Sequence, residues 1–275
     1  GGPAMSRYLK EGLRLTSYQS FAIGVLFLFH LIWSLLFYRF IQGHVVDVMG
    51  RFPPSELGDA RYNLFLNESL MLLQKTELAA PVLWLVLAYI GTRILLTPML
   101  HAGMYTSLQQ PSGPRGTIFI RGVRRYGGSF TWLYLLRLAM TAAPLYWAVP
   151  HTFSALAQAD SYASLSVALM PWILGITLYG GLLKVLFTYL LFALTAERSL
   201  LSSLAFSFKN LPSISGLAMI IFGIALMLGL TVYGISLYWA GFLSIVLYLA
   251  YPLIQIMLRV WAIAVQYKFW LANQS

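Results

Sequence analysis

Residues 164–194 read SLSVALMPWILGITLYGGLLKVLFTYLLFAL and contain a single charged side chain, that of Lys184. A helix needs about 20 predominantly apolar residues to cross the roughly 30 Å hydrocarbon core of a bilayer. The stretch is longer than that, and it lacks the regular alternation of apolar and polar residues found in membrane barrels. It therefore predicts a transmembrane helix.

The composition of the whole chain points the same way. Of its 275 residues, 59% are hydrophobic and 9% are charged, whereas soluble domains carry about 25% charged residues. Because irregular backbone is not tolerated in lipid, we expect an all-α polytopic membrane protein. Six apolar runs predict transmembrane helices arranged as three hairpins: 19–41, 80–108, 129–149, 164–194, 213–237 and 241–268.

The distribution of charge predicts the orientation of these helices. Arg7, Lys10 and Arg14 precede the first run, and the 109–128 loop contains four arginines and no acid. The 42–79 loop instead holds five acidic and three basic residues. Cytoplasmic loops collect Lys and Arg, so both termini are expected in the cytoplasm, and the protein in a bacterial plasma (inner) membrane. The same rule explains the net charge of +10, so nucleic acid is not an expected partner.

We expect residues 5–275 to form one membrane domain. Residues 1–4, which precede Met5, are interpreted as a remnant of protein expression. The outer 42–79 loop predicts an amphipathic helix on the membrane surface, with Ser55 as its N-cap.

Related short segments precede the first, third and fifth runs. They are Glu11–Arg14, Arg121–Arg124 and Leu201–Lys209. Each predicts an interfacial amphipathic helix that introduces a two-helix hairpin, which would make the chain a threefold repeat. The alternative is that these segments are alike only because inner loops in general are short, basic and amphipathic.

Two segments also resemble a known group of proteins. Leu100-His101-Ala102-Gly103-Met104-Tyr105 ends the second run, and Ser199–Lys209 is amphipathic. With the order of the hydrophobic hairpins, they resemble bacterial six-span proteins related to the membrane domain of glycerophosphodiester phosphodiesterases. That resemblance implies six spans, a bacterial plasma membrane and nearby lipid chemistry. The soluble catalytic barrel of those enzymes has no counterpart here.

Four cations inside the apolar runs are the candidate ligand-binding residues: Arg93, Arg137, Lys184 and Arg259. A charge at the bilayer centre costs about 2.5–3.5 kcal/mol on insertion scales, so such residues usually mark a site. Counted along the helices, all four lie roughly 12–20 Å from the cytoplasmic boundary. No acidic residue shares these runs, which predicts a common cationic cavity for an anion. The alternative is that the long side chains reach the interface individually.

Polar neighbours on the same helix faces extend this candidate site. Tyr89 and Tyr134 lie one turn before two of the arginines, and Tyr251 and Gln255 lead to Arg259 at four-residue spacing. Arginine forms bidentate contacts with phosphate, and lysine acts as a point charge. The set therefore predicts a site for a phosphate-bearing headgroup.

These patterns favour a transporter, flippase or binder of an anionic lipid or phosphorylated amphiphile. The alternative is a non-catalytic membrane subunit that docks or regulates a partner protein. An enzyme is not expected, because cysteine is absent and no paired carboxylates or metal-ligand spacing occur in the runs. We expect no cofactor. Without a nucleotide-binding motif, ATP could act only through a partner ATPase subunit.

Membrane lipids, mostly anionic, are the expected partners at the inner surface. The residues predicted to contact them there are Arg115, Arg121, Arg124 and Arg125.

Overall fold

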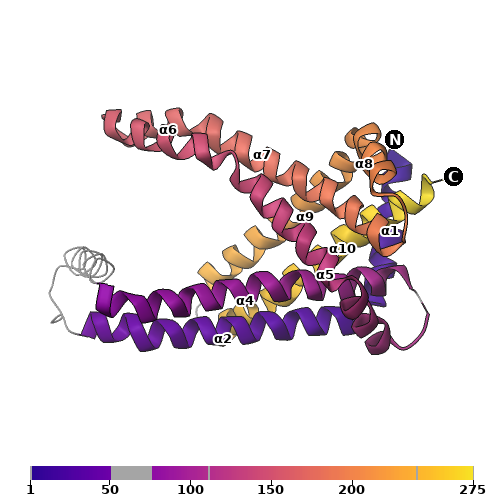
Figure 1. Ribbon diagram of the computed structural model, residues 1–275, viewed down its shortest axis with the longest axis horizontal. Helices are drawn as coiled ribbons and strands as arrows, with labels where there is room; N and C mark the ends of the chain where they lie inside the picture. The colour runs from indigo at the N-terminus through magenta and orange to yellow at the C-terminus, as the bar shows by residue number, and fades with distance from the viewer. Residues whose placement is uncertain (1, 51–75, 111, 240, 275) are drawn as a thin grey trace. The chain divides into compact units, whose positions relative to one another are not determined.

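The computed structural model (Figure 1) describes residues 2–50, 76–110, 112–239 and 241–274. This part of the chain contains helices and no strand, which confirms the all-α prediction. The helices are α1 (Gly2–Ser17), α2 (Ser20–Gly50), α4 (Thr76–Gln109), α5 (Arg115–Ala142), α6 (Leu145–Gln158), α7 (Tyr162–Thr195), α8 (Leu200–Lys209), α9 (Leu211–Tyr238) and α10 (Phe242–Ala272).

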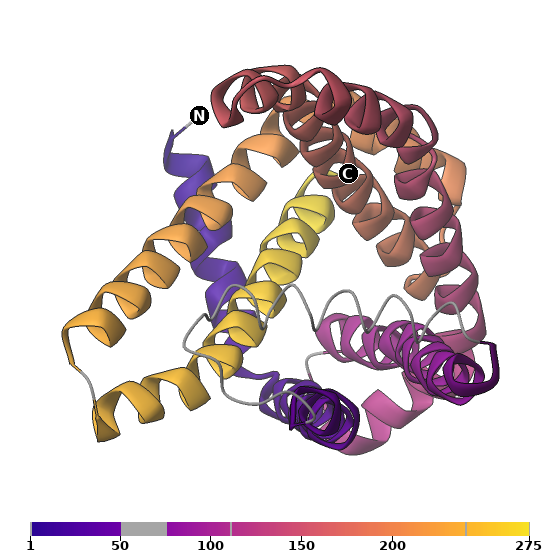
Figure 2. The same cartoon turned by 90° about the vertical axis from the view of Figure 1, so that its left-hand side faces the viewer.

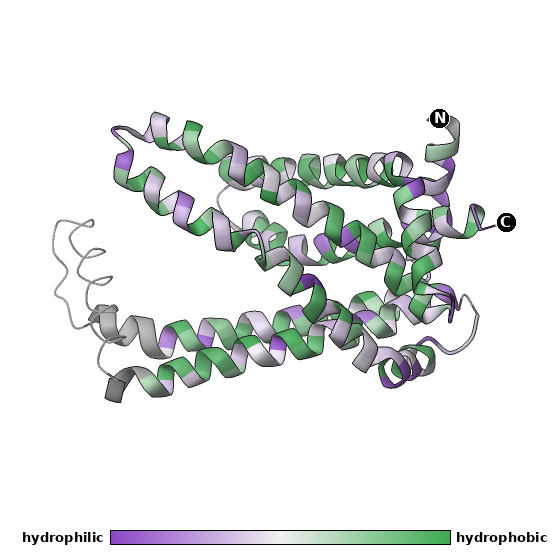
Figure 3. Ribbon diagram, turned by 45° about the horizontal axis from the view of Figure 1, so that its top comes forward, coloured by the Kyte–Doolittle hydropathy of each residue, from purple (hydrophilic) through white to green (hydrophobic). Residues whose placement is uncertain are grey.

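Five helices of the described residues are long and apolar enough to cross a membrane. They are Ser20–Gly43, Ala80–Gln109, Tyr162–Thr195, Leu211–Tyr238 and Phe242–Ala272. Hydrophobic residues cover much of their surfaces (Figure 3). The chain is therefore a multi-pass membrane protein, and five of the six predicted spans have a matching helix.

The predicted span over 129–149 is not one regular helix. Helix α5 begins earlier, at Arg115, and ends at Ala142, and the separate helix α6 follows from Leu145. Proline lacks the backbone N–H and its ring crowds the preceding turn, so Pro144 interrupts the hydrogen-bond ladder. Both Ala143 and Pro144 keep right-handed helical dihedral angles, which makes the interruption a kink.

The 109–128 segment also differs from its prediction. Residues 115–125 are the first turns of α5, not a separate interfacial helix. The apolar periodicity of the sequence does not distinguish these two arrangements, because the same residues are helical in both.

The loop predicted over 42–79 is shorter than expected at both ends. Helix α2 continues to Gly50 and α4 begins at Thr76, because a helix need not end where the bilayer does. The amphipathic helix and its Ser55 cap, predicted within this loop, fall largely on residues 51–75, outside the part of the chain that the structure describes.

The chain forms two compact units, residues 1–24 with 98–275 and residues 25–97. In the second unit, α2 packs against α4. The Trp33 and Tyr89 rings meet edge to face with their centroids 4.5 Å apart, and the Tyr89 hydroxyl donates a hydrogen bond to the Trp33 carbonyl oxygen at 3.3 Å.

The core of the first unit lies where the C-terminal halves of α4, α7 and α10 meet. Phe192 of α7 is fully buried, and its ring contacts those of Tyr105, Tyr189, Tyr267 and Trp270. Beyond this core, α6 packs along α7, and α9 packs along α10 (Figure 1).

Three short helical segments pack through small residues on the ends of longer helices. Gly12 of α1 touches the Val265 backbone of α10, where an added Cβ would lie 2.9 Å from N and Cα. Gly122 of α5 lies against α4. Ser203 of α8 donates a hydrogen bond to the Tyr189 carbonyl oxygen of α7 at 2.8 Å. Figure 2 shows α1, in indigo, meeting α10. Small side chains permit such close approaches between helices.

Candidate functional site

Three of the four predicted cations come together within the first unit. Arg137 lies on α5, Lys184 on α7 and Arg259 on α10. The charges of Arg137 and Arg259 both repel the Lys184 ammonium. All three cations also act on the imidazole of His101 on α4. Arg137, Lys184 and Arg259 are called the cation cluster below, and His101 from a fourth helix lies beside it.

No carboxylate belongs to the helices that bring these cations together. Helices α5, α7 and α10 contain no Asp or Glu. Lys184 precedes the end of α7 by eleven residues, or about 16 Å along the helix axis.

Aromatic and hydroxyl groups surround the cation cluster. Tyr105 lies one turn after His101 and is 3% exposed, and its phenol interacts with the Thr188 side chain and with the charge of Arg137. The Arg137 guanidinium lies 5.3 Å from the centroid of the Tyr134 ring, a cation–π contact of the predicted pair. His101 and Tyr105 were not predicted members. Their position near the C-terminal end of α4, beside the apolar run, was the signal available in the sequence.

The remaining predicted ligand-binding residues have other surroundings. Arg93 is exposed on α4 and belongs to the second unit, so its membership of the cation cluster stays a prediction. The Tyr89 hydroxyl donates its hydrogen bond to the Trp33 carbonyl oxygen. Tyr251 packs against Gly229 of α9, and Gln255 is exposed on α10.

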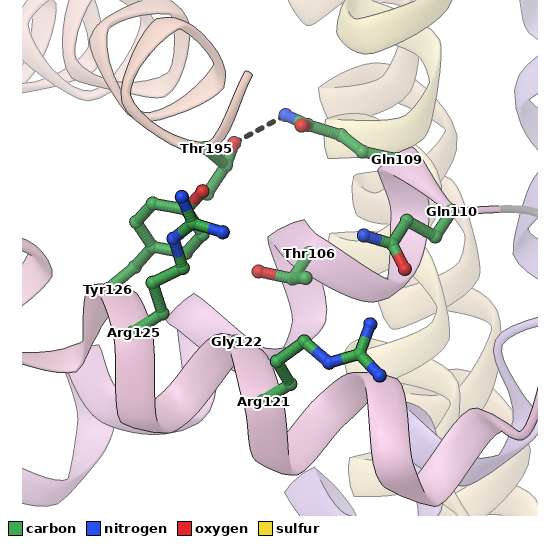
Figure 4. A pocket seen from close by; sticks show the side chains of 8 residues that line it. All are labelled: Thr106, Gln109, Gln110, Arg121, Gly122, Arg125, Tyr126 and Thr195. Atoms are coloured by element: carbon green, nitrogen blue, oxygen red, sulfur yellow. Dashed lines mark hydrogen bonds between the residues drawn. The ribbon is translucent and has the colours of Figure 1, made fainter. Parts of the chain in front are cut away.

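A cavity of about 190 Å³ lies at the junction of α4, α5 and α7 (Figure 4), and we call it the junction pocket. Its walls are the last turn of α4, the early turns of α5 and the end of α7. The lining residues are Thr106, Gln109, Gln110, Arg121, Gly122, Arg125, Tyr126 and Thr195.

The four predicted surface arginines divide between different surroundings. Arg121 and Arg125 line the junction pocket. Arg124 lines only an adjoining open hollow of about 450 Å³, together with the first two. Arg115 instead donates hydrogen bonds to the carbonyl oxygens of Ser107 at 3.1 Å and Gln110, and so caps the C-terminal end of α4.

Glu197, two residues after the end of α7, contacts two of the side chains that line the junction pocket. It forms an ion pair with Arg125 and accepts a hydrogen bond from the Tyr126 hydroxyl at 3.2 Å. Partial burial and this hydrogen bond raise the pKa of Tyr126 above its ordinary value. The hydroxyl thus stays protonated and keeps donating to the carboxylate.

The backbone at Glu197 is left-handed, with φ of 56°. The N–H of Arg198 bonds to the Ala193 carbonyl oxygen at 2.8 Å, and the N–H of Glu197 to that of Leu194 at 3.3 Å. These two bonds define a Schellman motif, in which glycine is the usual residue at the position of Glu197. The side chain is therefore retained at a conformational cost of about 1–2 kcal/mol.

A metal site needs several ligating side chains close together. Among the described residues, no group of three or more His, Cys, Asp or Glu side chains could hold an ion.

Comparison with models of protein families, with curated proteins and with solved structures finds no match. The resemblance to the membrane domain of glycerophosphodiester phosphodiesterases stays a prediction.

Proposed function

We propose that this protein binds an anionic lipid or phosphorylated amphiphile within the membrane, as a binder, flippase or transporter. The observation that carries the proposal is the cation cluster, in which Arg137 and Arg259, each from a different helix, lie near enough to Lys184 for their charges to repel it. Each charge held in the hydrocarbon region costs about 2.5–3.5 kcal/mol on insertion scales. An anionic headgroup among the three would offset both the desolvation and the repulsion.

The chemistry of the cation cluster favours phosphate over a simple halide. Guanidinium groups form paired hydrogen bonds to phosphate oxygens, and an ammonium adds an undirected charge. Tyr105, Thr188 and His101 lie beside these cations and add groups that hydrogen-bond to oxygen. In this proposal Arg137, Lys184 and Arg259 line one cavity that opens toward the inner leaflet.

A topology of six spans completes the proposal. Helices α5 and α6 together form the kinked third span, and the chain makes three hairpins with both termini in the cytoplasm of a bacterium. This orientation puts Arg121, Arg124 and Arg125 at the inner membrane surface. Each basic residue there contributes about 1 kcal/mol to the attraction of anionic lipids.

The test is binding of defined lipids by the full-length purified chain in nanodiscs. We expect phosphatidylglycerol and phosphatidic acid to bind in preference to phosphatidylcholine. Arg259→Gln and Lys184→Gln should each weaken that binding about 30-fold or more, since losing one partner of a desolvated charge pair costs about 2–5 kcal/mol. Arg39→Gln is the matched control, because Arg39 is an exposed cation on α2 outside the cation cluster.

Two results would overturn the proposal. One is equal binding by the wild type and the cation-cluster variants, and the other is a preference for neutral lipid. Either would leave the partner-docking subunit as the leading function. A dithionite assay with fluorescent lipid in liposomes then separates a flippase from a binder, because only a flippase exposes inner-leaflet label faster than protein-free vesicles.

A further inference from the structure

We propose that the junction pocket is a second anion site, which takes one phosphate group between Arg121, Arg125 and Gln110. It shares no residue with the cation cluster, so either proposal can fail without the other. The argument rests on the size of the pocket, its uncommitted donors and the position of Glu197.

The volume of the pocket suits a small group. At about 30 Å³ of liquid volume per water molecule, 190 Å³ is room for about six waters. Pockets for larger organic ligands measure about 300–1,000 Å³. A phosphate group fits this space, and a whole lipid does not.

Two donor groups at the pocket are uncommitted. Among the described residues, no hydrogen-bond or ion-pair partner is found for the Arg121 guanidinium or the Gln110 side-chain amide. Figure 4 shows these two groups near each other at one side of the pocket, with Arg125 on the other side. An anion between them would accept hydrogen bonds from both.

The helix geometry concentrates positive charge at this place. Arg121 and Arg125 are four residues apart on α5, so they share a face, and like charges at that spacing repel each other. A Cβ on Gly122 would lie 2.4 Å from the Thr106 hydroxyl oxygen, so only glycine lets this turn of α5 lie directly on α4. The close approach brings both arginines to the polar end of α4.

Glu197 behaves as an internal substitute for the phosphate. Its carboxylate binds Arg125, the same guanidinium that a phosphate in the pocket would use. The left-handed backbone at Glu197 favours glycine, yet a carboxylate stands there. An incoming phosphate must therefore compete with Glu197 for Arg125, and removing the charge of Glu197 should tighten binding.

The pocket is reached through the adjoining hollow. Arg121 and Arg125 line both spaces, and the hollow also includes Arg124 and the exposed Ile120. An apolar side chain beside three arginines suits a lipid whose headgroup enters the pocket. A water-soluble phosphate compound would use the same donors.

The experiment measures affinity for two probes with the full-length chain in nanodiscs of phosphatidylcholine. One probe is inorganic phosphate, and the other is phosphatidic acid incorporated at increasing fractions. We expect Arg121→Gln to weaken binding about tenfold or more, and Glu197→Gln to strengthen it about threefold or more. Arg124→Gln removes the same charge from the same helix outside the junction pocket, and should change the affinity for inorganic phosphate less than threefold.

The outcomes distinguish a general phosphate site, a lipid headgroup site and diffuse surface attraction. Binding of both probes with this order of variants supports a general phosphate site, and binding of phosphatidic acid alone with the same order supports a lipid headgroup site. Equal weakening by Arg121→Gln and Arg124→Gln would show diffuse surface attraction and overturn the proposal. So would unchanged or weaker binding by Glu197→Gln, because misfolding cannot mimic a gain in affinity. Variants of the cation cluster should leave inorganic phosphate binding at this pocket unchanged.

Discussion

Gly122 on α5 lies so close to Thr106 on α4 that a Cβ added to it would stand 2.4 Å from the Thr106 hydroxyl oxygen and 2.9 Å from the Ala102 carbonyl oxygen. Thr106 cannot turn away freely, because its hydroxyl donates a hydrogen bond to that carbonyl at 2.9 Å. The contact joins two segments of the chain that are separated by a loop, and it positions the junction pocket.

Gly122→Ala should therefore destabilise the protein. Overpacking a tight contact costs about 1–3 kcal/mol, which outweighs the gain of about 0.5–1 kcal/mol from replacing glycine in a helix. Gly128→Ala is the matched control. Gly128 is on the same helix, and a Cβ added to it would meet nothing within 4 Å. Thermal unfolding in detergent should show a lower Tm for Gly122→Ala and an equal or higher Tm for Gly128→Ala. Equal Tm values for the two variants would contradict the contact.

Gln266→Leu should also lower the Tm. The Gln266 amide donates to the Ile214 carbonyl oxygen at 3.2 Å and accepts a hydrogen bond from the Tyr189 hydroxyl, so one side chain joins α10 to α9 and α7. Tyr189 and Ile214 are both buried. A buried polar group left without a hydrogen-bond partner costs about 1–3 kcal/mol.

Gln255→Leu serves as its control. Gln255 is exposed on the same helix, and we expect little change in unfolding temperature there. The interpretation of Gln266 fails if both variants unfold at the wild-type temperature.

Gly12→Ala should release α1 from α10. The added Cβ would lie 2.4 Å from the Val265 side chain and 2.9 Å from its backbone, and backbone atoms cannot move aside cheaply. Hydrogen exchange of α1 amides should become faster. Gly24→Ala, where nothing lies within 4 Å, should exchange like the wild type. Unchanged protection of α1 in Gly12→Ala would contradict this packing.

Long apolar runs were sufficient to predict five of the spanning helices, because length and hydropathy alone decide such helices. The run at 129–149 was harder. Proline occurs inside continuous helices at Pro171 and Pro252, yet the helix is interrupted at Pro144. Neighbouring helices decide whether the lost hydrogen bond is tolerated, and a single run does not reveal its neighbours.

The candidate sites were predictable only in part, for a similar reason. Arg137, Lys184 and Arg259 stand out because each is a charge inside an apolar run. His101 and Tyr105 join them through the rotation of α4 in the bundle, which periodicity does not fix. The sequence also gives no means to separate Arg115, which caps α4, from Arg121, which lines a pocket.

The packing of α1 on α10 has a consequence for synthesis. The indole N–H of Trp261 donates a hydrogen bond to the Leu9 carbonyl oxygen at 3.0 Å, across 252 residues of sequence. Segments nearer the N-terminus leave the ribosome first, so α1 is made before the described helices that separate it from its partner α10. The docking of α1 therefore waits until α10 has been synthesised, and a ribosome stalled before α10 would hold a chain whose first helix is still undocked.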